Sequence, residues 1–292
     1  MSDSQWRREL AEEFAAGYRE RPGVRSVLLS GSVARGTADR YSDIELLVVW
    51  SGPPGDDVRP AAVAAGGGQL VTAYEYDDEN AEWSDDVLHS GVEIQVSHRT
   101  EAATGQWITD VTAGFDPDLT KQDLIALIRT GVPLAGAGLI DEWRRQADDY
   151  PAPLGDAMIR AHLAFRSAWQ RRKLLDRQDL IPLYADLVDT ARNVVLVLLG
   201  LNHTYFPHLG FKWVPALAAS LAEAPPGLGD RLATLFTAAP AEAVRAADAL
   251  IEETLELVAA RRPEVGAAEE LILVRQTRPV WAAPPPPFRS VS

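Results

Sequence analysis

The chain has 292 residues, 47% of them hydrophobic, which is enough for a packed core in one large domain or two of ordinary size. It has no cysteine, which excludes disulfides, thiolate metal sites and a cysteine nucleophile. The formal net charge is −14, and nucleic-acid binders usually present a basic face to phosphates, so nucleic acid is not an expected partner. The N-terminus has no apolar signal segment, and the run Val194–Leu201 is too short to span a membrane, so a cytoplasmic protein is expected.

The first hundred residues predict alternating helices and strands. Apolar residues at helical spacing, with Ser4 as a candidate cap, predict a helix over residues 4–20, and Pro22-Gly23 ends it. Short apolar runs predict strands over Val24–Ser30, Asp43–Trp50, Gln69–Tyr76 and Val92–His98, with a short helix over Val58–Ala65. This part of the chain, residues 1–114, is therefore expected to be a small α/β domain.

The chain after this domain is predicted to be helical. Thr100 is a candidate helix cap, and further helices are expected over Asp123–Arg129, Leu139–Asp148, 154–176, 180–200, 213–222, 227–237 and 240–262. Four consecutive prolines near the C-terminus are incompatible with a helix or a central strand. The expected fold class is α+β, with an α-helical bundle domain over residues 115–275 and a Pro-rich tail over residues 276–292.

The stretch Ser30–Trp50 carries the clearest chemical signal. Gly31 permits the backbone to approach a ligand closely, and free N–H groups at a helix start, together with the Ser32 hydroxyl, suit a phosphate oxygen. Residues two apart on a strand share a face, so Asp43 and Glu45 point the same way. Two carboxylates beside an anion-binding turn predict a site where Mg²⁺ bridges to a polyphosphate.

Three other interpretations of this stretch are less favoured. The glycines from Gly31 to Gly36 resemble P-loop spacing, but Thr37-Ala38 stands where Lys-Ser/Thr is required, which argues against a Walker-type kinase. A nucleophilic Ser32 lacks the G-x-S-x-G elbow. The third interpretation is an edge strand with two solvated acids, and a strand-terminal Gly-Ser so soon before the acids makes it less favoured.

The pattern resembles the signature of the polymerase-β-like nucleotidyltransferases, which is Gly-Ser, about ten residues, and then Ser-Asp-x-Asp/Glu between apolar positions. Here it stands as Gly31-Ser32 followed by Ser42-Asp43-Ile44-Glu45. The stretch looks most like that of small bacterial enzymes that nucleotidylate antibiotics such as aminoglycosides and lincosamides. The second acid is Glu rather than the more frequent Asp, which changes the reach of the carboxylate but not its charge.

The resemblance implies a role for each residue of the signature. Asp43 and Glu45 are expected to ligate two Mg²⁺ ions, while Gly31 and Ser32 hold the triphosphate of ATP or another NTP. Lesser candidates for phosphate contact and for support of the site are Arg35 and Ser42.

The family also implies a third carboxylate on a later strand. Glu93 fits best, because apolar residues alternate with Glu93 and Gln95 in Val92–Val96, so Glu93 faces away from the core. Glu75 is the rival, and a site without a third acid in this region is the remaining alternative. Glu93 is then a metal ligand and a candidate general base.

The second half carries a weaker resemblance. The motif Leu201–Pro207, followed by Lys212-Trp213, looks like a helical domain of unknown function that is often fused to such nucleotidyltransferases. A polar stripe of Asp186, Asp189 and Asn193 on an apolar helix is compatible with a ligand site or with a solvated face. The run 171–173, Arg-Arg-Lys, is expected to be a solvated helical face.

The expected function is transfer of a nucleoside monophosphate from an NTP to a hydroxyl of a small molecule, with release of pyrophosphate. The acidic balance favours a cationic acceptor. The alternative is a non-catalytic nucleotide sensor or an antitoxin-type nucleotidyltransferase that acts on a protein partner. Loss of a carboxylate would mark that alternative, and since none is lost, the enzyme is preferred.

Overall fold

The computed structural model describes residues 2–278, which pack as two compact units. Unit 1 runs to Leu154 and takes in the later segment His203–Gly210, while unit 2 runs from Gly155 to Asn202 and resumes at Phe211. The α+β class is confirmed, because a mixed sheet in the N-terminal part is followed by a helical region. The boundary predicted after residue 114 stays a prediction, and residues 279–292 of the predicted tail lie outside the described residues.

Unit 1 is built on a six-stranded mixed sheet. The strands are β1 (Val24–Leu29), β2 (Ile44–Trp50), β3 (Gln69–Ala73), β4 (Trp83–His89), β5 (Val92–Thr100) and β6 (Val132–Ala135). Their order across the sheet is β3-β4-β5-β2-β1-β6. Only β2 and β5 pair in parallel, with Glu45 opposite Gln95, and the other neighbours are antiparallel. The two strands that carry the predicted acids are therefore direct neighbours.

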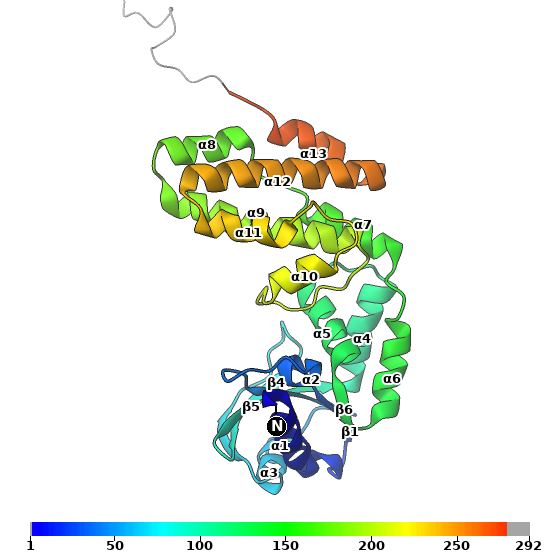
Figure 1. Cartoon of the computed structure of the whole chain (residues 1–292). Helices are drawn as coiled ribbons and strands as arrows, with labels where there is room; N and C mark the ends of the chain where they lie inside the picture. The colour runs from blue at the N-terminus through cyan, green and yellow to red at the C-terminus, as the bar shows by residue number, and fades with distance from the viewer. Residues whose placement is uncertain (1, 279–292) are drawn as a thin grey trace, which may run out of the picture. The chain divides into compact units, whose positions relative to one another are not determined.

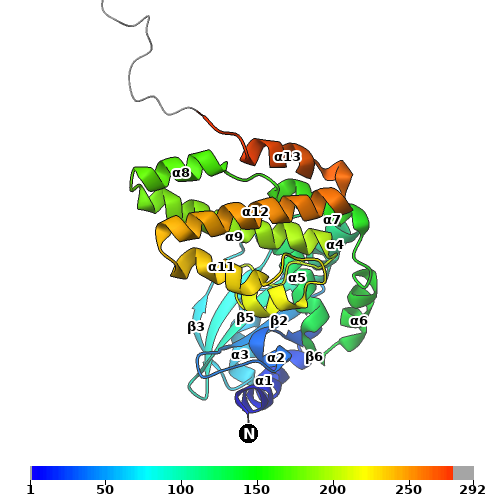
Figure 2. The ribbon, with the colours of Figure 1, turned by 45° about the horizontal axis from the view of Figure 1, so that its top comes forward.

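Helices cover both faces of this sheet. On one face, α1 (Asp3–Arg19) and α3 (Val58–Ala65) bury Phe14 and Val63 against the alternate residues of β1, β2 and β5. On the other face Leu28, Leu47 and Val49 are buried, and the helices there are α4 (Glu101–Thr112), α5 (Leu119–Thr130) and α6 (Ala137–Gln146) (Figure 2). The Thr100 cap of α4 is confirmed, since its side chain accepts from the Ala103 amide, but α1 is capped by Ser2 rather than Ser4.

Two strands of the sheet were missed by the sequence analysis. The strand β4 contains two adjacent aspartates, yet Asp85 is fully buried, where it accepts from Arg59 at 2.7 Å and pairs with His98 at 2.9 Å. Because a buried ion pair satisfies its charge, the acid is compatible with a core-facing strand position. The strand β6 contains Pro133, which is tolerated because β6 is an edge strand.

Unit 2 consists of helices around α12 (Figure 1). The elements are α7 (Ala152–His162), α8 (Ala168–Asp176), α9 (Leu180–Leu201), α10 (Val214–Ser220), α11 (Leu228–Thr237), α12 (Pro240–Arg261), a short 3-10 turn and α13 (Ala267–Val274). The long helix α12 packs against α8, α9, α11 and α13. Among the described helices of both units, none combines the length and the apolar character that crossing a membrane requires.

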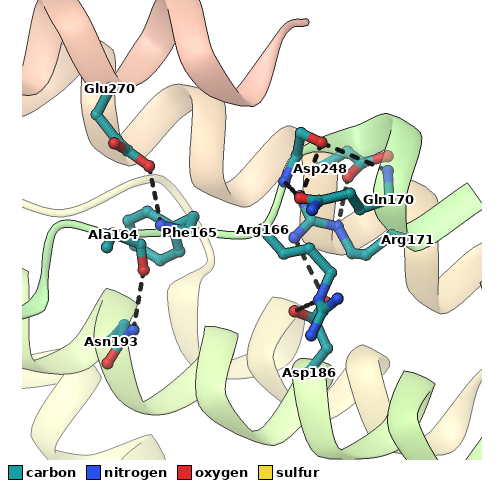
Figure 3. Close-up of polar contacts among 10 residues, drawn as sticks. Ala164, Phe165, Arg166, Gln170, Arg171, Asp186, Asn193, Asp248 and Glu270 are labelled. Carbon is teal, nitrogen blue, oxygen red and sulfur yellow. Dashed lines mark hydrogen bonds and ion pairs between the residues drawn. The ribbon is translucent and has the colours of Figure 1, made fainter. Parts of the chain in front are cut away.

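The helix predicted over residues 154–176 is broken in the structure. Residues 163–167 separate α7 from α8, and this short segment is held by polar contacts from both sides (Figure 3). The Phe165 amide donates to Glu270 at 2.9 Å, and the Asn193 side chain donates to the Ala164 carbonyl at 3.3 Å. Ser167 begins α8 with a capping box. These partners lie far away in sequence, so helical periodicity alone did not reveal the break.

A buried ion network lies beside this segment. Arg171 is 1% exposed, donates to Asp248 at 2.7 Å and lies 3.5 Å from Asp186. Asp186 is 7% exposed and accepts from Arg166 at 2.8 Å (Figure 3). The prediction of a solvated face is therefore wrong for Arg171, and of the two alternatives for the polar stripe the solvated face does not hold for Asp186, because each charge is buried against an opposite charge.

Candidate active site

The turn between β1 and β2 is built around a glycine with a left-handed backbone. The short helix α2 (Gly31–Arg35) begins one residue after β1 ends, and Gly31 has φ of +66°. The Ser30 amide donates to the Glu45 carbonyl at 2.9 Å, which holds the start of the turn beside β2. Gly36, with φ of +76°, ends the helix. A strand-terminal turn thus lies where the Gly-Ser pattern predicts it.

The Glu45 side chain lies directly against this turn. Its Oε2 atom is 1.8 Å, and its carboxyl carbon 2.6 Å, from the position that a Cβ would take on Gly31. The neighbouring Ile44 and Leu46 are 0% and 2% exposed, as expected for residues on the opposite side of the strand. Only glycine at residue 31 leaves room for the carboxylate beside the backbone.

An open pocket of about 250 Å³ lies at this turn. Its lining includes Gly31, Arg35 and Glu45 from the signature and Gln95 from the neighbouring strand β5. It also includes Asp123 from α5, which the sequence analysis placed in a helix but did not connect with the site. The sequence signal for Asp123 is weak, since a lone acid on a predicted helix is usually solvated.

Asp123 is partly buried and lies close to other charges. Burial raises the pKa of its carboxyl group to about 6, the negative charge of Glu45 adds to this increase, and the positive charge of Arg35 opposes it. A second carboxylate near Glu45 is costly unless a cation or a proton compensates for it. The pocket therefore has the electrostatic character of a site for a cation or a hydrogen-bond donor.

The other phosphate-binding candidates have different environments. Ser32 is partly exposed, and its carbonyl accepts from the Thr37 amide at 2.9 Å. The Ser42 hydroxyl accepts from the Asp39 amide at 3.0 Å and donates to the Asp39 carboxylate at 3.2 Å. Its carbonyl accepts from Arg7 at 2.8 Å, so Ser42 holds the loop before β2 and is not among the residues that line the pocket.

The structure separates Asp43 and Glu93 from the lining of the pocket. Asp43 immediately precedes β2, and Glu93 is exposed on β5. The parallel pairing of β2 with β5 begins at Ile44 opposite Ile94, so Asp43 and Glu93 each lie one residue before the first pair. Asp43 therefore lies two residues before Glu45, and Glu93 lies two residues before Gln95, the residue that pairs with Glu45. The rival Glu75 lies beyond the end of β3 and is exposed.

Comparison with known families is consistent with this geometry. Residues 8–106, which include the turn, Glu45 and Glu93, match the model of the family described as "Nucleotidyltransferase domain". The N-terminal part of the chain is a nucleotidyltransferase domain. After it, residues 118–214 match a second family, described as "Domain of unknown function (DUF4037)".

Among solved structures, the chain is similar to a nucleotidyltransferase-like protein from Exiguobacterium sibiricum, with 12% sequence identity, a TM-score of 0.41, and coverage of 89% of this chain and 78% of that one. No curated protein matches the chain.

Nucleotidyltransferase domains generally use a nucleoside triphosphate and divalent metal ions. Within residues 2–278, no three His, Cys, Asp or Glu side chains are grouped as metal ligands, so Asp43, Glu45 and Glu93 do not form such a group. Mg²⁺, however, is usually held by one or two carboxylates together with water and substrate phosphates. The Glu45 carboxylate lines the pocket beside the Gly31 turn and supplies an oxygen donor of the kind that Mg²⁺ prefers. The residues present therefore fit a magnesium ion that binds together with its nucleotide.

Proposed function

We propose that the chain transfers a nucleoside monophosphate from an NTP, with ATP as the first candidate, to a hydroxyl of a small molecule and releases pyrophosphate. The observation that carries the proposal is the contact of the Glu45 carboxylate with the Gly31 turn, inside a pocket of the nucleotidyltransferase domain. An anion-binding turn and a metal-binding carboxylate at one point suit a magnesium-bound polyphosphate.

The residues of the chain divide between two tasks in this proposal. Gly31, Ser32 and Arg35 bind the triphosphate, with the exposed Arg35 guanidinium as the positive charge at the pocket. Asp43 and Glu45 hold the metal ions and orient the phosphates toward the acceptor. When bound, Mg²⁺ stabilises the charge on the attacking and leaving oxygens of an in-line displacement.

The proposed reaction forms one bond and breaks one. The acceptor oxygen bonds to the α-phosphorus, and the bond from that phosphorus to the oxygen bridging toward the β-phosphorus breaks, which releases pyrophosphate. The hydroxyl proton leaves to a carboxylate, for which Glu93 is the candidate because it lies, like Asp43, one residue before the first pair of β2 and β5. No redox partner or covalent enzyme intermediate is required.

Three further properties belong to the proposal. The acceptor is a small molecule, and the net charge of −14 favours a cationic one. Nucleic acid is not the expected acceptor, and the expected compartment is the cytoplasm. An aminoglycoside-like antibiotic is one example of such an acceptor, in line with the family resemblance. The Glu45 and Asp123 carboxylates at the pocket disfavour anionic acceptors.

The experiment is a mass-based screen. The purified chain is incubated with each NTP, Mg²⁺ and a panel of hydroxylated small molecules, and products are detected as acceptors heavier by one nucleoside monophosphate, with pyrophosphate assayed in parallel. Chelation of Mg²⁺ by EDTA should abolish both signals. Nucleotide binding without transfer to any compound would favour the nucleotide sensor, and the absence of nucleotide binding would refute the proposal.

A further inference from the structure

Two sequence regions contribute to the pocket of unit 1. The nucleotidyltransferase region, residues 8–106, supplies Gly31, Arg35 and Glu45, whereas the region that matches the domain of unknown function, residues 118–214, supplies Asp123, Leu127, Pro207 and His208. The second group comes partly from α5 and partly from the segment His203–Gly210, and both pack within unit 1. A region without an assigned role thus forms one wall of the pocket.

The segment 203–210 is fixed to unit 1 by specific contacts. The Phe206 amide donates to the Gln122 side chain at 3.3 Å, and Phe206 is 1% exposed. The Tyr205 ring lies 4.8 Å from Tyr150, and Tyr150 stacks on His203 at 5.6 Å with an interplanar angle of 11°. Since Gln122 directly precedes Asp123, one turn of α5 both anchors this segment and presents the acid to the pocket.

The chemistry of this wall differs from that of the phosphate-binding turn. Asp123 is an acid beside a second acid, Glu45, and within residues 2–278 no hydrogen bond engages its carboxylate. Leu127 and Pro207 add apolar surface next to it. A carboxylate with apolar neighbours suits a hydroxyl or ammonium group on a carbon ring, and it repels a phosphate or carboxylate.

We propose that Asp123, with the wall formed by Leu127, Pro207 and His208, is the acceptor-binding side of the pocket, and that it selects neutral or cationic hydroxyl compounds against anionic ones. Asp123 accepts a hydrogen bond from the acceptor. This inference rests on the proposed function, and it gives the domain of unknown function a role: completing the site of the nucleotidyltransferase domain that precedes it.

The test uses three matched probes: myo-inositol, which is neutral, inosamine, which is cationic, and inositol monophosphate, which is anionic. Calorimetry measures the binding of each probe to the full chain loaded with Mg²⁺ and α,β-methylene-ATP, which cannot release pyrophosphate. The variants are Asp123→Asn and, as a control, Asp141→Asn, which removes an exposed acid of unit 1 outside the pocket lining.

In the wild type we expect the neutral and cationic probes to bind and the anionic probe not to bind. Asp123→Asn should weaken inosamine about tenfold, which corresponds to one charge-assisted hydrogen bond, and should leave the affinity for the ATP analogue unchanged within about twofold. Asp141→Asn should resemble the wild type. Asp123→Asn also tests whether the carboxylate excludes anionic compounds, because inositol monophosphate should bind more tightly to the variant than to the wild type.

Other outcomes separate this inference from the proposed function. If the wild type does not bind the ATP analogue, the proposed function fails. If it binds the analogue but none of the neutral or cationic probes, or binds inositol monophosphate equally well, the inference about Asp123 is overturned while the proposed function stands. A loss of ATP-analogue affinity in Asp123→Asn that exceeds the loss for inosamine assigns Asp123 to the nucleotide side and also overturns the inference.

Discussion

The Glu45 carboxylate fills the space that a side chain on Gly31 would need. Its Oε2 atom lies 1.8 Å from the Cβ position of residue 31, far inside van der Waals contact, and residue 31 also has φ of +66°. Both facts restrict residue 31 to glycine, for different reasons. The first concerns the acid of the proposed metal site and the second concerns the backbone, so the two can be separated by mutation.

Gly31→Ala should abolish nucleotide binding, because the new methyl group displaces Glu45 from the turn. The matched control is Gly36→Ala, where φ is +76° but no atom lies within 4 Å of the added Cβ. Each variant should lose about 1 kcal/mol of stability from its left-handed backbone. Titration with α,β-methylene-ATP and thermal unfolding measure both effects. Equal nucleotide affinity in the two variants would show that the position of Glu45 does not matter.

Asp43→Asn should sharply reduce magnesium-dependent turnover and leave the fold intact. The change removes one anionic ligand with almost no change in volume, at a partly exposed position just before β2. Pyrophosphate release is measured against Mg²⁺ concentration, with circular dichroism as the check on folding. Wild-type turnover in the variant would remove Asp43 from the metal site.

Glu93→Gln should abolish transfer and retain nucleotide binding, since Glu45 and the Gly31 turn still hold the phosphates. Glu75→Gln, which changes an exposed acid beyond β3, should be nearly silent and is the matched control. Turnover and nucleotide affinity are measured side by side. The reverse pattern would assign the base to Glu75, and two silent variants would leave the proton acceptor to another group.

Asp123→Asn should stabilise the unliganded protein at neutral pH. The native pKa of about 6 lies above the ordinary value of 3.8, so the native state holds its proton more tightly than the unfolded state. Stability therefore falls as pH rises from about 4 to 6, and the full penalty, on the order of 3 kcal/mol, applies above that range. Thermal unfolding at pH 7.5 and pH 4 tests this. The variant should exceed the wild type only at the higher pH, and an equal difference at both values would contradict the assignment.

Arg171→Met should destabilise unit 2 by about 3–5 kcal/mol, because it leaves Asp186 and Asp248 without their shared buried cation. The control is Arg172→Met on the same helix, where the ion pair with Asp176 is exposed and contributes at most about 1 kcal/mol. Chemical denaturation measures both free energies of unfolding. A small effect at Arg171 would mean that water reaches the two aspartates.

The local part of the candidate site was predictable from the sequence. Gly31 and Glu45 are brought together by one turn and one strand pairing, so their spacing and the alternation of Ile44, Glu45 and Leu46 along the strand were enough to predict that the acid faces away from the core. The same local rules predicted the cap at Thr100. The physical reason is that strand alternation and capping depend on residues a few positions apart.

Only the tertiary structure decided the parts that depend on distant partners. Asp123 reaches the pocket because α5 packs at the sheet. The strand β4 accepts a buried Asp85 because Arg59 compensates its charge and His98 hydrogen-bonds to it. The break at residues 163–167 exists because Glu270 and Asn193 satisfy its backbone. For Asp85 and the segment 163–167, a polar group that local patterning assigns to solvent is paired with a partner far along the chain, and this pairing offsets the cost of leaving water. For Asp123, the packing of its helix alone sets the position, and local patterning does not contain that information.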